Sequence, residues 1–333
     1  MLLWGLIGEG SRYMSNVSAV ADVARLDANK FRDPDTTVDG QKRASVALNG
    51  LRTLWFNTGT LCNLTCTNCY IESSPTNDRL SYISAAEVAA LLDELDSDWQ
   101  AEEIGFTGGE PFMNPEIIPM LEDSLRRGYD VLVLTNAMRP MLKLKAPLLD
   151  LKERYGDKLC LRVSIDHYSK ELHEVERGAH AWDRMTEGLT WLSENGFHIN
   201  AAGRTYWPES EDRLREGFGR TFKAHGIRID HNDPAALVLF PEMDETVDVP
   251  EITEACWGIL NVDPDDMMCA SQRMVVKRKG EDKPKVVPCT LLPYDTEFEM
   301  GSTLAEAGGD VKLNHPHCAK FCVLGGGSCS VGD

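Results

Sequence analysis

Apolar runs of strand length alternate with stretches of helical periodicity along the middle of the chain. The first apolar run, residues 51–57, leads directly into a cysteine-rich loop. Ser84 is followed three residues later by Glu87, a capping-box signature that predicts the start of a helix. Further strands are expected at residues 103–106, 131–134, 159–165, 197–201, 227–229 and 236–240, and further helices at about 114–128, 140–155, 181–195 and 208–226.

This alternation predicts an α/β fold of about six strand–helix units, because parallel strands need crossover helices between them. An open doubly wound sheet and a partial (β/α) barrel both fit the pattern, whereas the eight units of a full barrel do not. The alternation begins near residue 51 and stops near residue 245. We therefore expect an N-terminal extension (1–50), an α/β core (51–245) and a small cysteine-rich C-terminal domain (246–333).

Charge and hydropathy argue against two classes of partner. The chain carries 53 acidic and 34 basic residues, and binding to nucleic-acid phosphates needs clustered Lys and Arg. The longest apolar stretches are of strand length, short of the roughly 20 residues of a membrane-spanning helix. The N-terminus lacks the basic region and cleavage site of a signal peptide. We therefore expect a cytoplasmic protein with no nucleic-acid or membrane partner, in which clustered cysteines serve metal or redox chemistry.

Three cysteines with the spacing C-x₃-C-x₂-C follow the first strand: Cys62, Cys66 and Cys69. Three thiolates on one loop can hold three irons of a [4Fe–4S] cubane, which leaves the fourth iron open to a ligand from outside the protein. A thioredoxin-type dithiol at Cys66 and Cys69 is an alternative, against which the third cysteine argues. A structural zinc site is another, but its fourth ligand would have to come from far away in the sequence.

The cysteine run resembles the radical SAM (S-adenosylmethionine) superfamily when it is taken with a second motif, Thr107-Gly108-Gly109-Glu110-Pro111, at the end of the next strand. The resemblance covers roughly residues 50–240 and implies a partial (β/α)₆ barrel. It also implies that the three cysteines ligate a [4Fe–4S] cluster whose open iron is chelated by the amino and carboxylate groups of SAM.

The same resemblance implies a set of cofactor-binding residues at successive strand ends. Gly108 and Gly109 would let the backbone approach the methionine part of SAM closely, and Glu110 would receive its ammonium group. Asn68 departs from the family pattern, which usually has an aromatic residue near adenine at that position; Tyr70 follows the third cysteine instead. The implied set is Tyr70, Thr107, Gly108, Gly109, Glu110, Asn136, Ser164 and Asp166, with Arg177-Gly178 where members often carry an Arg-Gly pair.

The tail contains six of the ten cysteines and a predicted hairpin with its turn at Lys279-Gly280. Cysteines at both ends of a hairpin, followed by a later cysteine group, resemble the auxiliary-cluster extensions called SPASM or twitch domains. The implied ligands of one auxiliary [4Fe–4S] cluster are Cys269, Cys289, Cys318 and Cys322, with Cys329 as the alternate. Structural zinc is the competing interpretation, because His315 and His317 next to Cys318 offer mixed nitrogen and sulfur ligands. Cys160 lies inside an apolar strand and is expected to be a buried core residue.

The implied activity is reductive cleavage of SAM to methionine and a 5′-deoxyadenosyl radical, which abstracts a hydrogen atom from the substrate. An electron donor such as flavodoxin or ferredoxin is implied as a partner. We expect a small-molecule substrate, because the roughly 50 residues before the core look too short for a domain that binds a leader peptide; peptide modification is the alternative. A non-enzymatic iron–sulfur carrier or zinc-stabilised binding protein is a further alternative, but a carrier would gain nothing from an open iron.

Overall fold

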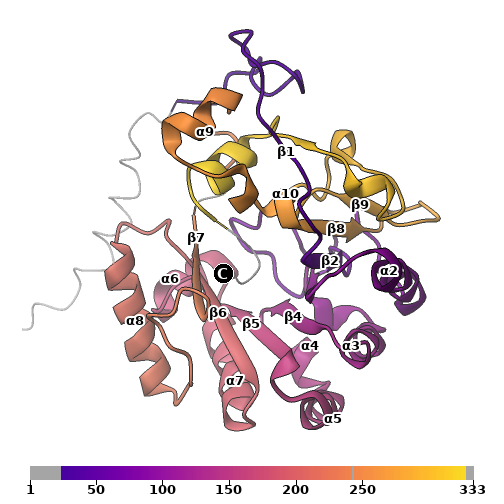
Figure 1. Ribbon diagram of the computed structural model, residues 1–333. Helices are drawn as coiled ribbons and strands as arrows, with labels where there is room; N and C mark the ends of the chain where they lie inside the picture. The colour runs from indigo at the N-terminus through magenta and orange to yellow at the C-terminus, as the bar shows by residue number, and fades with distance from the viewer. Residues whose placement is uncertain (1–23, 242–243, 328–333) are drawn as a thin grey trace, which may run out of the picture.

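An eight-stranded sheet forms the centre of the structure, a computed structural model that describes residues 24–241 and 244–327 (Figure 1). Its strand order is β7-β6-β5-β4-β3-β2-β8-β9, and all neighbouring strands are parallel except β8 and β9. The six sequential parallel strands from β2 to β7 confirm the predicted α/β fold. The strands are β2 (Thr53–Asn57), β3 (Glu103–Thr107), β4 (Asp130–Thr135), β5 (Leu159–Ser164), β6 (His198–Arg204), β7 (Leu237–Phe240), β8 (Gln272–Val276) and β9 (Lys285–Val287).

Helices cover the outer face of this curved sheet, which forms an open partial barrel (Figure 1). Successive side chains of a strand point to opposite faces. In β2, Leu54 and Phe56 therefore pack in the core beneath the helices, whereas Trp55 packs in a second apolar cluster with tail residues such as Met274. The helices are α2 (Ala85–Asp98), α3 (Ile117–Arg126), α4 (Arg139–Leu142), α5 (Lys145–Tyr155), α6 (Lys170–Arg177), α7 (Ala181–Glu194), α8 (Glu211–Ala224), α9 (Glu254–Leu260) and α10 (Met268–Ser271).

Within the α/β core, helix α6 and the expected strand at residues 227–229 depart from the sequence-based expectation; outside the core, α9, α10 and the short strands β1 and β10 were not predicted either. Helix α6 was not expected, because its buried residues are the polar His173 and Glu176 and no apolar repeat marks it. Residues 227–229 do not form the expected strand. Ile227 and Ile229 are buried in the core beneath the helices, while β6 pairs directly with β7.

The tail continues the core sheet instead of standing apart from it. Strand β8 pairs in parallel with β2, and β8 and β9 form the predicted hairpin, with Gly280 at a φ of 85° in the turn. The N-terminal extension also reaches the tail, because β1 (Ser45–Val46) pairs with β10 (Val311–Lys312). A buried ion pair of 2.5 Å between Arg43 and Glu251 joins the same two segments. The extension and the tail therefore pack together beside the barrel (Figure 1).

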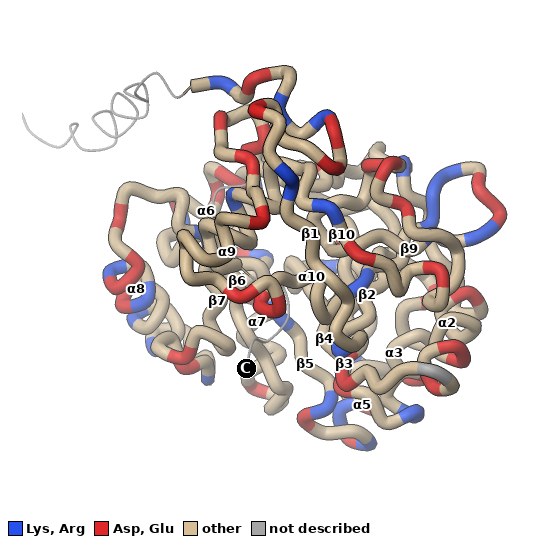
Figure 2. The backbone as a smooth tube through the Cα atoms, turned by 45° about the horizontal axis from the view of Figure 1, so that its top comes forward, with Lys and Arg blue, Asp and Glu red and all other residues tan. Residues whose placement is uncertain are grey.

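Acidic and basic residues are interspersed along the surface helices (Figure 2). Along α8, Arg215 pairs with Glu211 and Arg220 with Glu216, both at i,i+4 spacing. The Arg220–Glu216 pair is exposed, and an exposed pair of this kind contributes only about 0.3–0.5 kcal/mol. No helix among residues 24–241 and 244–327 has the length and apolar character needed to cross a membrane.

Candidate functional site

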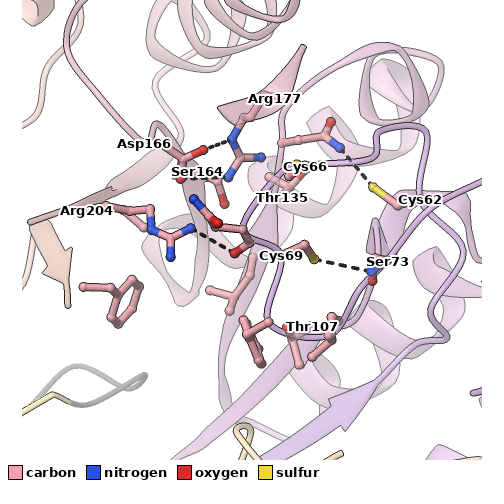
Figure 3. A pocket seen from close by; sticks show the side chains of 18 of the residues that line it. Cys62, Cys66, Cys69, Ser73, Thr107, Thr135, Ser164, Asp166, Arg177 and Arg204 are labelled. Carbon is pink, nitrogen blue, oxygen red and sulfur yellow. Dashed lines mark hydrogen bonds and ion pairs between the residues drawn. The ribbon is translucent and has the colours of Figure 1, made fainter. Parts of the chain in front are cut away.

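A pocket of about 1180 Å³, its open mouth included, lies at the carboxyl ends of the parallel strands (Figure 3). Parallel α/β folds bind their ligands at this end, where the strand-to-helix loops meet. Of the residues that the sequence implied for the cluster and SAM, Glu110 is the one that does not line this pocket. The others are Cys62, Cys66, Cys69, Tyr70, Thr107, Gly108, Gly109, Asn136, Ser164 and Asp166, and Arg177 joins them.

The cysteine loop follows β2 and presents its thiols to hydrogen-bond donors. The backbone N–H of Leu64 donates to Cys62 Sγ over 3.4 Å, and that of Ser73 donates to Cys69 Sγ over 3.4 Å. Burial raises the pKa of the Cys62 thiol to about 12 and also raises that of Cys66, while the Arg177 guanidinium acts in the opposite direction at both. Three neighbouring thiols, two of which accept a hydrogen bond from a backbone N–H, and a nearby guanidinium fit a cluster held by thiolates, because metal binding offsets the cost of deprotonating the thiols.

Gly108 and Gly109 bring the end of β3 against the stem of the cysteine loop. A Cβ at Gly108 would lie 2.5 Å from the carbonyl oxygen of Gly59, and one at Gly109 would lie 2.3 Å from that of Leu61. The backbone N–H of Gly109 donates to the Gly59 carbonyl over 2.8 Å. The two glycines are therefore required because two segments of this chain touch at these positions. The sequence alone suggests a different reason, close approach of the backbone to SAM.

Glu110 lies behind the pocket wall and joins the ends of β3 and β4. Its carboxylate accepts hydrogen bonds from Thr135 Oγ1 and from the backbone N–H of Asn136, each 2.8 Å long. Burial raises the pKa of this carboxyl to about 7, although those hydrogen bonds act to lower it. Asn136 itself lines the pocket and reaches the cysteine loop through a 3.0 Å bond to Asn63 Oδ1. Glu110 thus supports Asn136 from behind.

Asp166 and Arg177 form a buried ion pair that borders the pocket near the cysteine loop (Figure 3). Arg177 Nε donates to Asp166 Oδ2 over 2.5 Å, and Arg177 Nη2 donates to Oδ1 over 3.3 Å. Burial alone would raise the pKa of Asp166, but the guanidinium outweighs it and holds the pKa below its usual range. A carboxylate held ionised in this way can accept hydrogen bonds from the hydroxyl groups of a ligand.

Asn68 ties the cysteine loop to α6, which gives a structural reason for its departure from the family pattern. Its side-chain amide donates to Glu176 Oε1 over 2.8 Å, and its backbone carbonyl accepts from Arg204 Nη1 over 3.0 Å. The neighbouring Thr67 N–H donates to the Glu176 carbonyl over 2.8 Å. Residues 67 and 68 are thus fixed by hydrogen bonds to Glu176 on α6 and to Arg204 on β6.

Several pocket residues were not identified from the sequence. Arg162 precedes Ser164 by two positions on β5, so strand alternation could have placed both on the pocket face. No local pattern points to Leu291 and Phe321, which come from the tail and line the same pocket. Phe321 stacks on Phe240 with ring centroids 5.8 Å apart. The tail therefore supplies an apolar wall to the pocket.

A second, smaller cavity, of about 370 Å³ with its opening to solvent included, brings together the four first-choice auxiliary-cluster cysteines of the tail. Burial raises the pKa of Cys269 to about 11 and that of Cys318 to about 12. Cys256 is not among the lining residues, and Cys329 lies outside the described residues. Within the described residues, no three Cys, His, Asp or Glu side chains lie close enough together to ligate one metal ion in their present conformations. The lining is Cys269, Cys289, Cys318, Cys322 and His317 with seven apolar residues: Met267, Met268, Pro288, Leu291, Leu292, Val311 and Leu313.

Comparison with known proteins shows both sequence and fold relatives. AlbA of Bacillus subtilis, the antilisterial bacteriocin subtilosin biosynthesis protein, is 30% identical over 143 residues, which are 42% of this chain and 30% of AlbA. A probable GTP 3′,8-cyclase of Saccharolobus islandicus is 28% identical over 130 residues, 39% of each chain. The crystal structure of Streptococcus suis SuiB bound to S-adenosylmethionine has a TM-score of 0.56 at 12% identity, and the match covers 77% of this chain and 64% of that chain.

These matches define how far the likeness extends. The chain matches only 30% and 39% of the lengths of the two curated relatives, and the likeness to SuiB shows a shared fold. Residues 56–216 match the family model of the Radical SAM superfamily, a segment that contains the cysteine loop and the strand ends around the pocket. This match confirms the resemblance drawn from the two sequence motifs, and we conclude that the chain belongs to the radical SAM superfamily of enzymes.

Proposed function

We propose that this protein is a radical SAM enzyme that modifies a peptide, with SAM and a [4Fe–4S] cluster bound in the pocket at the strand ends. The observation that carries the proposal is the convergence of Cys62, Cys66 and Cys69 with the Asp166–Arg177 pair on one pocket. When bound, the reduced cluster and SAM supply a 5′-deoxyadenosyl radical that takes a hydrogen atom from the substrate.

The residues of the chain bind and orient these groups. The three thiols would hold three irons of the cluster and leave the fourth for the amino and carboxylate groups of SAM. Ser164 and Asp166 stand at the end of β5 as acceptors for ribose hydroxyls, and Arg177 keeps Asp166 ionised. Asn136 and Thr107 also line the pocket and would supply further polar groups. An electron donor such as flavodoxin or ferredoxin would reduce the cluster.

A peptide substrate has better support than the small molecule expected from the short N-terminal extension. SuiB has been solved bound to the precursor peptide SuiA, and AlbA acts in the biosynthesis of the bacteriocin subtilosin. In this chain Leu291, Phe240 and Phe321 give the pocket an apolar wall that suits an amino-acid side chain. The match to the probable GTP 3′,8-cyclase keeps a small-molecule substrate as the second candidate.

We also propose that the tail cavity holds an auxiliary [4Fe–4S] cluster. Four thiols from the ends of the β8–β9 hairpin and from residues 318–322 share one buried, mostly apolar cavity, and cysteine thiolates are the usual ligands of such clusters. The cavity is separated from the strand-end pocket by Leu291, which lines both. The proposed auxiliary cluster would therefore lie behind the apolar wall to which Leu291 belongs.

Metal analysis combined with an assay for 5′-deoxyadenosine tests the proposal. After anaerobic reconstitution we expect about eight irons per chain and 5′-deoxyadenosine formation with dithionite and SAM. Alanine at Cys62, Cys66 and Cys69 together should abolish the product, and product that persists would refute the cofactor assignment. A precursor peptide encoded beside the gene should stimulate the reaction, and stimulation by GTP instead would favour the second candidate.

A further inference from the structure

His317 is a fifth potential metal ligand in the tail cavity. Its side chain lines the cavity together with Cys269, Cys289, Cys318 and Cys322, and the residue is only 5% exposed. Its Nδ1 atom is buried and has no hydrogen-bond partner among the described residues. A buried nitrogen without a partner is costly, and apart from the thiols the rest of the lining is apolar. The cavity is therefore lined by an imidazole nitrogen that could bind a metal and that has no hydrogen-bond partner among the described residues.

The surroundings of the imidazole indicate which nitrogen carries the proton. Glu245 Oε2 lies 4.0 Å from His317 Nε2, so the carboxylate favours the proton on that side of the ring. A neutral imidazole has one protonated nitrogen and one lone pair, which leaves the lone pair on Nδ1. Metal-ligating histidines commonly direct the other ring N–H toward a carboxylate, and the Glu245 carboxylate lies on the Nε2 side of His317, at ion-pair distance and beyond hydrogen-bond length.

We propose that His317 ligates one iron of the auxiliary cluster through Nδ1, beside three of the four tail thiols. The proposal rests on the proposed function, because it assumes that the tail cavity holds an iron–sulfur cluster. A neutral imidazole in place of a thiolate makes the cluster less negatively charged, and histidine ligation raises the reduction potential of an iron–sulfur cluster relative to cysteine ligation. His317 would thus make the auxiliary cluster a better electron acceptor than an all-cysteine cluster in the same cavity.

The test uses the full chain with Cys62, Cys66 and Cys69 replaced by alanine, so that the tail is the site left to hold a cluster. After anaerobic reconstitution, iron and sulfide per chain are counted and the cluster is reduced with dithionite. Pulsed EPR then measures hyperfine coupling to ¹⁴N, and labelling with ¹⁵N-histidine identifies the nitrogen. The same measurements are made on the added substitutions His317→Ala, His317→Cys and His315→Ala.

His315 provides the matched control. It is also buried, at 9% exposure, and its Nε2 lies 3.7 Å from the same Glu245 carboxylate. Unlike His317 it does not line the cavity, and its Nδ1 already accepts a 3.1 Å hydrogen bond from the His317 backbone. Replacing His315 therefore perturbs the same region without removing the proposed ligand.

We expect strong coupling to a histidine nitrogen in the parent and in His315→Ala, and its loss in both His317 variants. His317→Cys should keep about four irons and shift the midpoint potential to a more negative value, because a thiolate adds a negative charge. About four irons without a strong histidine coupling would overturn the His317 assignment alone. A tail that takes up no iron, or that takes up zinc instead, would refute the auxiliary cluster and the His317 assignment together.

Discussion

Replacing Gly109 with alanine should displace the cysteine loop. The added Cβ would lie 2.3 Å from the Leu61 carbonyl oxygen and 2.8 Å from that of Thr60. Backbone carbonyls cannot rotate away as a flexible side chain does, so the end of β3 and the cysteine loop would have to separate by about 1 Å. The backbone φ at Gly109 is not in the left-handed region, so the whole effect is steric.

The cost follows from the contacts between these two segments. Overpacking of this kind costs about 1–3 kcal/mol. The separation would also weaken the hydrogen bonds from Gly109 N–H to the Gly59 carbonyl, 2.8 Å long, and from Glu110 N–H to the Leu61 carbonyl, 3.2 Å long. Each contributes about 1 kcal/mol. Because relaxation relieves part of the overlap, we expect Gly109→Ala to lower the free energy of unfolding by about 3 kcal/mol.

Gly258→Ala is the matched control, with the opposite expected sign. Gly258 is exposed within helix α9, and a Cβ there would have no heavy atom within 4 Å. Alanine should therefore stabilise the protein by about 0.5–1 kcal/mol, because it is the better helix former. The assay is urea denaturation of the cluster-free chain, followed by iron analysis after reconstitution. A Gly109→Ala protein with wild-type stability and a full iron content would refute the packing argument.

Three further substitutions test other parts of the structure. Burial acts to raise the pKa of Glu251, but the Val38 N–H and the Arg43 guanidinium hold it below its ordinary value of 4.5. The ionised Glu251 therefore contributes its full share to the free energy of unfolding above pH 4.5, and this contribution declines as the pH falls through the lower pKa of the folded state. Glu251→Gln should cost about 3–5 kcal/mol at pH 7 and flatten this acid limb in urea titrations at several pH values. Asn68→Ala leaves the Glu176 carboxylate without its amide donor, costing about 1–3 kcal/mol, and should speed iron loss from the first cluster to a chelator; an unchanged rate would contradict the bracing role. Cys160→Ala removes a thiol buried on β5, away from both cysteine cavities, and should leave the iron content unchanged, whereas a loss of iron would make Cys160 a ligand.

Local patterns in the chain predicted the strand ends and the chemistry of the first cluster. Short apolar runs along the chain predicted the strands β2 to β7, because a buried parallel strand is covered by apolar groups on both faces. The spacing of Cys62, Cys66 and Cys69 within one loop needs no distant partner to be informative. By contrast, α6 could not be predicted from an apolar repeat, because its buried side chains, His173 and Glu176, are polar. Glu176 accepts a hydrogen bond from Asn68 in the cysteine loop, a contact that no local pattern reveals.

The sequence by itself determined the class of fold, the open-site cysteine loop and the two groups of cysteines, since these depend on residues close together in the chain. The tertiary structure decided why Gly108 and Gly109 are needed, how Asn68 is held, and that Leu291 and Phe321 reach the strand-end pocket. These features arise where segments far apart in the chain come into contact. Such contacts depend on the packing of the whole core, in which many weak interactions act together. The spacing of residues within one segment therefore cannot predict them.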